Sequence, residues 1–175
     1  LSILTPLAHA EGESITGATD NKVTAVGSVK MVRVVLPDKA NDQLKNIVSV
    51  FARQVQQRCG AKVITQGNAP LTVSIKIDSS IGKEGFRITE HHSGGIEVAG
   101  HNELGVLYGL GKLLRTSRYS EDGFVPGSWR GESIPEKPVR GIYFATHFHN
   151  FYHDAPVEKI QRYVEDLALW GLNAL

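Results

Sequence analysis

The chain has 175 residues, which is enough for about one domain with a hydrophobic core and part of a second. Its 19 lysine and arginine residues nearly balance 18 aspartate and glutamate residues, and no basic stripe is present, so nucleic acid is not expected as a partner. No stretch approaches the roughly 18 apolar residues that a membrane-spanning helix requires, so no membrane span is expected.

Residues 1–28 are expected to form a signal-peptide remnant and a flexible lead-in. Ala8-His9-Ala10 has the small residues of a signal-peptidase cleavage site, and a polar segment rich in Gly, Ser and Thr follows from Glu11. The alternative is a frayed N-terminus, since no positively charged leader is present. The cleavage site predicts a secreted or periplasmic protein. The single cysteine, Cys59, cannot form an internal disulfide.

Residues 29–116 are expected to form a small α/β domain with one sheet and two helices. Residues 30–36 are a β-branched run typical of a strand, and apolar residues then recur at helical spacing from Pro37-Asp38 to about Arg58. Apolar and polar residues alternate on both sides of Ser93-Gly94-Gly95, which predicts a hairpin. The further strands expected before this turn are residues 62–65, 71–77 and 85–90.

The second helix of this domain is expected to begin after Asn102 and to contain three glycines. Gly105 and Gly109 are four residues apart and share a face, which predicts close packing of the helix against the sheet. A phosphate-binding role is disfavoured, because the glycines do not follow a strand and lack the dinucleotide and P-loop spacings.

Residues 117–138 are rich in glycine and proline, which predicts a linker between domains. Residues 139–175 then have the order apolar strand, polar segment, helix from Pro156 to Gly171, and a second apolar strand. This is one βα unit and the start of the next, as in (β/α)₈ barrels, which need about 250 residues. The predicted fold class is therefore α/β: a small α/β domain followed by the first βα unit of a truncated TIM barrel, in a fragment of a longer protein.

Four segments occur along the chain in a characteristic order: I-E-V-A-G, G-V-L-Y-G-L-G-K-L-L, I-P-E-K-P and R-G-I-Y-F. This order resembles the family 20 glycoside hydrolases, the β-N-acetylhexosaminidases, and related α-glucuronidase-like enzymes, most clearly over residues 86–175. The resemblance implies a noncatalytic α/β domain before a catalytic barrel, a carbohydrate substrate and no cofactor. It also implies that the catalytic carboxylates lie on later strands, so no residue within this chain is expected to be catalytic.

The resemblance implies that Arg140, which opens the first barrel strand, binds sugar hydroxyls with its fork of N–H donors. The alternative is an arginine at the rim of the barrel that pairs with a carboxylate for stability. Ala145 and Phe148 stand where the hexosaminidases usually have Asp and Arg. An α-glucuronidase-like enzyme therefore stays open, as does a noncatalytic carbohydrate-binding module.

A cluster of polar and aromatic residues follows the predicted strand, at the end where barrel enzymes bind substrates. His147 and His149 share one side of an extended strand, and Asn150 and Tyr152 come next. Histidine and asparagine can hydrogen-bond to sugar hydroxyls, while aromatic rings stack on sugar faces, so this loop is expected to bind substrate. One alternative is a metal site, but the H-E-x-x-H pattern is absent, so no metal is predicted. The other alternative is a structural loop in which Asp154 caps the next helix.

Overall fold

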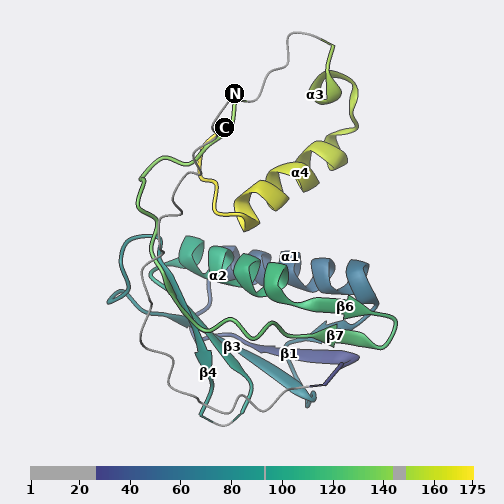
Figure 1. Cartoon of the computed structure of the whole chain (residues 1–175), viewed down its shortest axis with the longest axis vertical. Helices are drawn as coiled ribbons and strands as arrows, with labels where there is room; N and C mark the ends of the chain where they lie inside the picture. Colours follow the sequence, from purple (N-terminus) through teal and green to yellow (C-terminus); the bar gives the residue numbers. More distant parts are fainter. Residues whose placement is uncertain (1–26, 93, 144–148) are drawn as a thin grey trace, which may run out of the picture.

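The computed structural model describes residues 27–92, 94–143 and 149–175. In this part of the chain a mixed six-stranded sheet is covered on one face by helices α1 (Asp42–Cys59) and α2 (Glu103–Thr116). Helix α4 (Val157–Leu169) lies on the outer side of those two helices, as Figure 1 shows. None of the helices in the described ranges is both long and apolar enough to cross a membrane.

The sheet has the strand order β2-β1-β3-β5-β4-β8, in which β2, β1, β3 and β5 are parallel and β4 is antiparallel to both of its neighbours. Ile88 pairs with Val98 across the hairpin of β4 and β5, as the alternation of apolar residues predicts. The strands are β1 (Met31–Val35), β2 (Lys62–Ile64), β3 (Leu71–Ile77), β4 (Phe86–Glu90), β5 (Ile96–Gly100) and β8 (Gly131–Ser133).

The hydrophobic core lies between the sheet and helices α1 and α2. Alternate strand residues such as Val34 and Val73 are fully buried, because successive side chains in a strand point to opposite faces. One face of α1 is buried because apolar residues recur along it every three or four positions, and its Phe51 packs edge-on against Phe124 at 6.4 Å between ring centroids. The predicted α/β class is confirmed by this arrangement.

The start of α1 differs from the sequence prediction. The helix does not begin at Pro37-Asp38, where Ala40 N–H instead closes a turn by donating to the Pro37 carbonyl at 3.0 Å. Asn41 is the N-cap, since its side-chain oxygen accepts from Leu44 N–H at 2.9 Å and satisfies one of the first helical donors. The predicted cap of α2 is correct: the Asn102 side chain accepts from Gly105 N–H at 3.1 Å.

Residues 117–138, predicted as a linker, contain three short strands. Strands β6 (Arg118–Ser120) and β7 (Gly123–Val125) form a hairpin, and β8 extends the main sheet by pairing with β4. Phe124 in this hairpin is fully buried in the core. The segment therefore completes the α/β domain before it leads to the rest of the chain.

Helix α4 and the residues after it fold back over the α/β domain. Gly141 and Ala174 form a parallel bridge, in which Ala174 follows helix α4 by a short turn. The central residues of the predicted first barrel strand, 144–148, lie outside the described residues, so the strand itself stays a prediction. The polar segment after it contains an unpredicted four-residue helix, α3 (Phe151–Asp154).

Candidate functional site

The predicted site residues that the structure describes fall into two groups, one at Arg140 and one at residues 149–154. We call Arg140 with its contacts the Arg140 cluster, and we call residues 149–154 with Tyr163 the α3 cluster. The first lies against the α/β domain, whereas α3 lies at the far end of the molecule (Figure 1). His147, also predicted to bind substrate, lies outside the described residues.

All three side-chain nitrogens of Arg140 donate hydrogen bonds within the protein. Nη2 donates to Glu84 Oε2 at 2.6 Å, Nε donates to the Gly171 carbonyl at 2.7 Å, and Nη1 donates to the Lys137 carbonyl at 2.8 Å. The guanidinium also lies over the Tyr108 ring, 5.4 Å from its centroid. Arg140 thereby connects the α/β domain, the segment before the predicted barrel strand and the turn after α4.

Glu84 is held as a carboxylate by this arrangement. Its side chain is only 15% exposed, and it accepts a second hydrogen bond from Asn173 Nδ2 at 3.2 Å. The hydrogen bond from Arg140 lowers the pKa of Glu84, and Asn173 acts in the same direction. Glu84 has a left-handed backbone, with φ of 57°, in a tight loop, so its position depends on the loop as well as on the ion pair.

The Arg140 cluster matches the alternative in which this arginine pairs with a carboxylate for stability. Its partner Glu84 lies 56 residues earlier and was not identified from the sequence, because neither local spacing nor a motif connects the two positions. The binding of sugar hydroxyls by Arg140 stays a prediction.

The α3 cluster brings three predicted residues together at one helical turn and its cap. The Asn150 side-chain oxygen accepts from Tyr152 N–H at 3.1 Å and caps α3, while His149 precedes it with a left-handed φ of 44°. The Tyr152 hydroxyl donates to the Tyr163 hydroxyl at 3.1 Å, which connects α3 to α4. Because this bond holds the proton of Tyr152, it raises the pKa of that phenol.

Aromatic and polar groups lie side by side in the α3 cluster. Phe151 is 52% exposed and packs edge-on against Tyr152, with 5.6 Å between ring centroids. The rings of His149 and His153 are 4.6 Å apart. Exposed rings beside imidazole and amide groups can stack on a sugar face and hydrogen-bond to its hydroxyls.

The alternative role of Asp154 as the cap of the following helix is wrong. Asp154 ends α3, and the N-cap of α4 is Pro156, which makes no side-chain capping bond. Asp154 instead shares a small exposed group with His149 and His153, in which one potential metal-ligand atom of each lies within 4.8 Å of the others.

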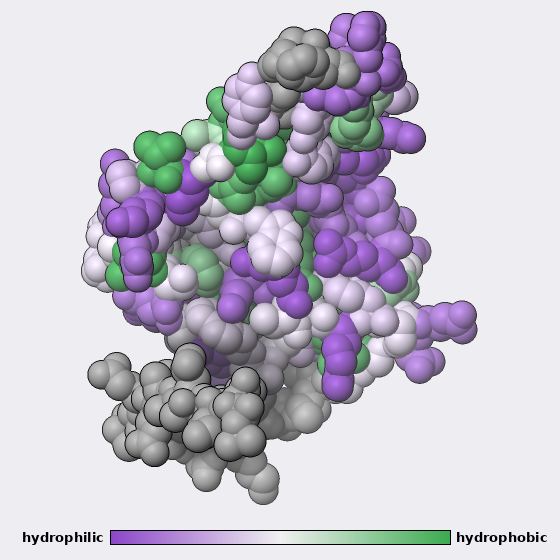
Figure 2. Space-filling view, turned by 45° about the horizontal axis from the view of Figure 1, so that its top comes forward, coloured by the Kyte–Doolittle hydropathy of each residue, from purple (hydrophilic) through white to green (hydrophobic). Residues whose placement is uncertain are grey.

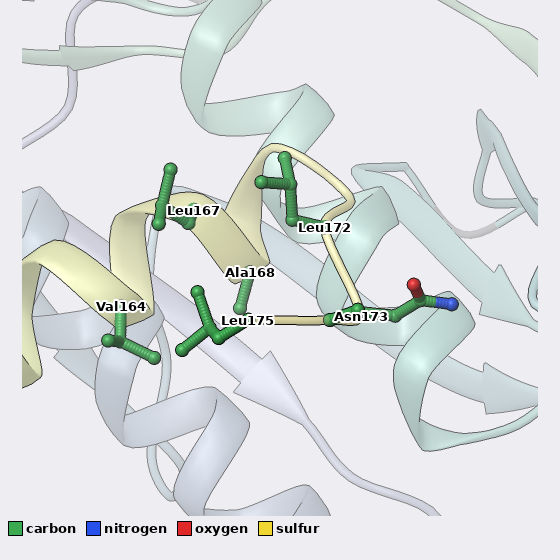
Figure 3. A pocket seen from close by; sticks show the side chains of 7 residues that line it. Val164, Leu167, Ala168, Leu172, Asn173 and Leu175 are labelled. Atoms are coloured by element: carbon green, nitrogen blue, oxygen red, sulfur yellow. The ribbon is translucent and has the colours of Figure 1, made fainter. Parts of the chain in front are cut away.

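A third feature is an apolar pocket of about 290 Å³ between α4 and the last residues of the chain. Figure 3 shows Val164, Leu167 and Leu175 around it, and its only polar side chain is that of Asn173. Figure 2 shows apolar surface, in green, in the same upper part of the molecule. With no titratable lining group, this pocket is a packing surface rather than a site for chemistry.

Comparisons with known proteins find likeness in structure only. No family model and no curated protein sequence matches the chain. A glycoside hydrolase family 20 exo-β-N-acetylglucosaminidase from Vibrio harveyi, solved with N-acetylglucosamine, matches 82% of this chain with a TM-score of 0.59 and 16% identity. The Flavobacterium johnsoniae chitobiase matches 82% with a TM-score of 0.59 and 22% identity.

A third structure, a family 20 β-N-acetylglucosaminidase, matches 86% of this chain with a TM-score of 0.57 and 23% identity. The chain spans only 21%, 23% and 27% of the lengths of these three proteins. At such identities the likeness establishes the fold. The α/β domain and the residues that follow it are arranged as in part of these larger enzymes.

Proposed function

We propose that this chain is the N-terminal part of a secreted or periplasmic glycoside hydrolase that cleaves glycosidic bonds in oligo- or polysaccharides, most closely akin to the β-N-acetylhexosaminidases. The observation that carries the proposal is the fold likeness, which extends over more than four fifths of the chain in three family 20 enzymes. The Ala8-His9-Ala10 sequence supports secretion.

The α3 cluster is the proposed substrate contact. His149 and Asn150 would hydrogen-bond to sugar hydroxyls, and Tyr152 with the exposed ring of Phe151 would form the apolar surface for a sugar face. The predicted role of His147 belongs to the same proposal. Arg140 positions the start of the strand from the other end through Glu84.

The chemistry of the proposed enzyme requires carboxylates that we place outside these 175 residues. A hexosaminidase-like enzyme would use a glutamic acid as general acid while the acetamido group of the substrate attacks. An α-glucuronidase-like enzyme would use two carboxylates, with water as the nucleophile. The two mechanisms require different substrates, so substrate choice separates them.

The test is an assay of the product of the complete reading frame that contains this chain. We expect it to hydrolyse 4-nitrophenyl N-acetyl-β-glucosaminide, and Asn150→Ala and Tyr152→Ala to raise KM. His92→Ala, a change on the distant β4–β5 hairpin, is the matched control and should leave KM unchanged.

If the protein hydrolysed glucuronic acid-substituted xylo-oligosaccharides and not the N-acetyl-β-glucosaminide, the α-glucuronidase-like alternative would be assigned. Binding of either sugar without turnover would assign a noncatalytic carbohydrate-binding module. Neither binding nor turnover with any of these sugars would overturn the proposal.

A further inference from the structure

Two histidines and an aspartate meet at the short helix α3, with His149 directly before its N-cap Asn150. His149 and His153 are four residues apart, their rings are 4.6 Å apart between centroids, and Asp154 follows directly. One nitrogen of each imidazole and one oxygen of the carboxylate all lie within 4.8 Å of one another. All three residues are exposed, so ions from solvent can reach them.

We propose that His149, His153 and Asp154 bind a divalent transition-metal ion of the zinc class. Two imidazoles and one carboxylate are a ligand set that zinc accepts, with a fourth position left to water. Ligand atoms around tetrahedral zinc are about 3.4 Å apart, given bonds of about 2.0–2.1 Å. Rotation of exposed side chains can close the present separation of up to 4.8 Å without moving the backbone.

The helix is what makes these ligands adjacent. If residues 147–149 continued as a strand, His147 and His149 would be the pair on one side. No metal was predicted for that arrangement because the H-E-x-x-H pattern is absent from the sequence. In the structure His149, with its left-handed backbone, instead precedes the capped turn of α3, and its ring lies 4.6 Å between centroids from that of His153. Asn150 caps this turn and the Tyr152–Tyr163 hydrogen bond attaches it to α4, so the ligands start from an ordered backbone.

The metal site shares His149 with the proposed substrate contact, and its test uses the metal alone so that its outcome does not depend on glycosidase activity. Chelator-treated protein without an affinity tag is titrated with ZnCl₂ by calorimetry and with CoCl₂ by visible absorption. We expect one site of micromolar affinity, with the d–d bands of four-coordinate cobalt and a shift of the His153 imidazole resonances. His153→Ala and Asp154→Asn should each weaken zinc binding about tenfold or more.

The chain offers a matched control in His91 and His92. Their rings are 4.2 Å apart on the β4–β5 hairpin, but the described residues place no third ligand of this kind beside them. The double variant His91→Ala/His92→Ala should keep the affinity of the wild-type protein. Circular dichroism checks that each variant is folded. His153→Gln should also lose zinc affinity, and because glutamine is a good helix former, that loss would not come from unfolding of α3.

Equal zinc affinity in the wild-type protein, His153→Ala and Asp154→Asn would overturn the proposal. So would a loss of affinity confined to the His91 and His92 variant, or zinc binding that does not saturate.

Discussion

Gly111 of α2 and Leu169 of α4 meet at the level of the backbone. A Cβ atom on Gly111 would lie 2.8 Å from the carbonyl carbon of Leu169, closer than real Cβ contacts come. The Arg115 guanidinium donates to the carbonyl oxygen of the same residue, and the Leu169 side chain is only 5% exposed. The end of α4 is therefore built into the core of the α/β domain.

Gly111→Ala is expected to loosen this contact. Although alanine favours a helix by up to about 1 kcal/mol over glycine, overpacking against fixed backbone costs about 1–3 kcal/mol. We expect a lower free energy of unfolding in urea and faster hydrogen exchange in α4. Gln57→Ala, on the exposed side of α1, should change neither. If Gly111→Ala left hydrogen exchange in α4 unchanged, the close contact between the backbones of α2 and α4 would not contribute to stability.

Leu169→Ala is expected to lower the free energy of unfolding by about 2–3 kcal/mol, because it leaves a cavity in the shared core. The matched control is Leu175→Ala, which removes the same atoms from a residue that is 62% exposed. That change should cost less than about 0.5 kcal/mol. Equal effects of the two substitutions in thermal unfolding would contradict the docking of α4 on the domain.

Arg140→Met is expected to destabilise the 175-residue chain by about 1–3 kcal/mol, because it leaves the half-buried Glu84 carboxylate without its main donor. Methionine keeps much of the apolar stem of the side chain, so the lost stability measures the contribution of the guanidinium group. Lys159→Met on the exposed side of α4 is the control for removing one positive charge. If both variants unfold at the same urea concentration, the Arg140 cluster does not stabilise the fold.

The ion pair of Glu84 predicts a pH dependence of stability. Its pKa in the folded state lies below the ordinary value of 4.5, so the folded protein binds fewer protons than the unfolded chain in this range. The stabilisation is therefore complete above pH 4.5 and is lost as pH falls through the folded pKa. We expect the difference in unfolding free energy between wild type and Glu84→Gln to shrink as pH falls. A constant difference from neutral pH to pH 3 would falsify this account.

Tyr163→Phe tests the connection between α3 and α4. It removes the acceptor that holds the Tyr152 proton, so the pKa of Tyr152 should fall toward its ordinary value of 10.0. The measurement is the titration of the Tyr152 ring carbon by NMR in protein labelled at tyrosine. An unchanged titration of Tyr152 would mean that the hydroxyls do not share a hydrogen bond in solution.

The glycines of α2 illustrate how much of the packing could be predicted. Close approach of Gly105 and Gly109 to the sheet was predicted from their spacing and is confirmed: a Cβ on Gly109 would lie 2.7 Å from Val98 Cγ1. Gly111 lies outside this four-residue spacing, and its partner Leu169 is 58 residues away (169 − 111) in another part of the chain. The spacing of glycines predicts that a helix face packs closely, but it does not identify the element that packs against it.

The α3 cluster had the same limit. The residue types predicted a polar and aromatic segment after an apolar strand, and His149, Asn150 and Tyr152 do lie together. Which other side chains these three residues contact depends on whether the backbone of the segment is extended or helical. Asn150 decides this by capping a helical turn, which joins His149 to His153 and places Tyr152 beside Tyr163.

The sequence by itself determined the main strands and helices of the α/β domain as far as α2, because strand alternation, helical spacing and capping residues act over a few positions. It was sufficient for the α/β class, the apolar face of α1 and the cap of α2. Only the tertiary structure decided that β8 extends the sheet, that Glu84 holds Arg140 and that α4 ends against Gly111. These pairings join residues far apart in the chain, and they form where the folded backbone brings complementary surfaces together.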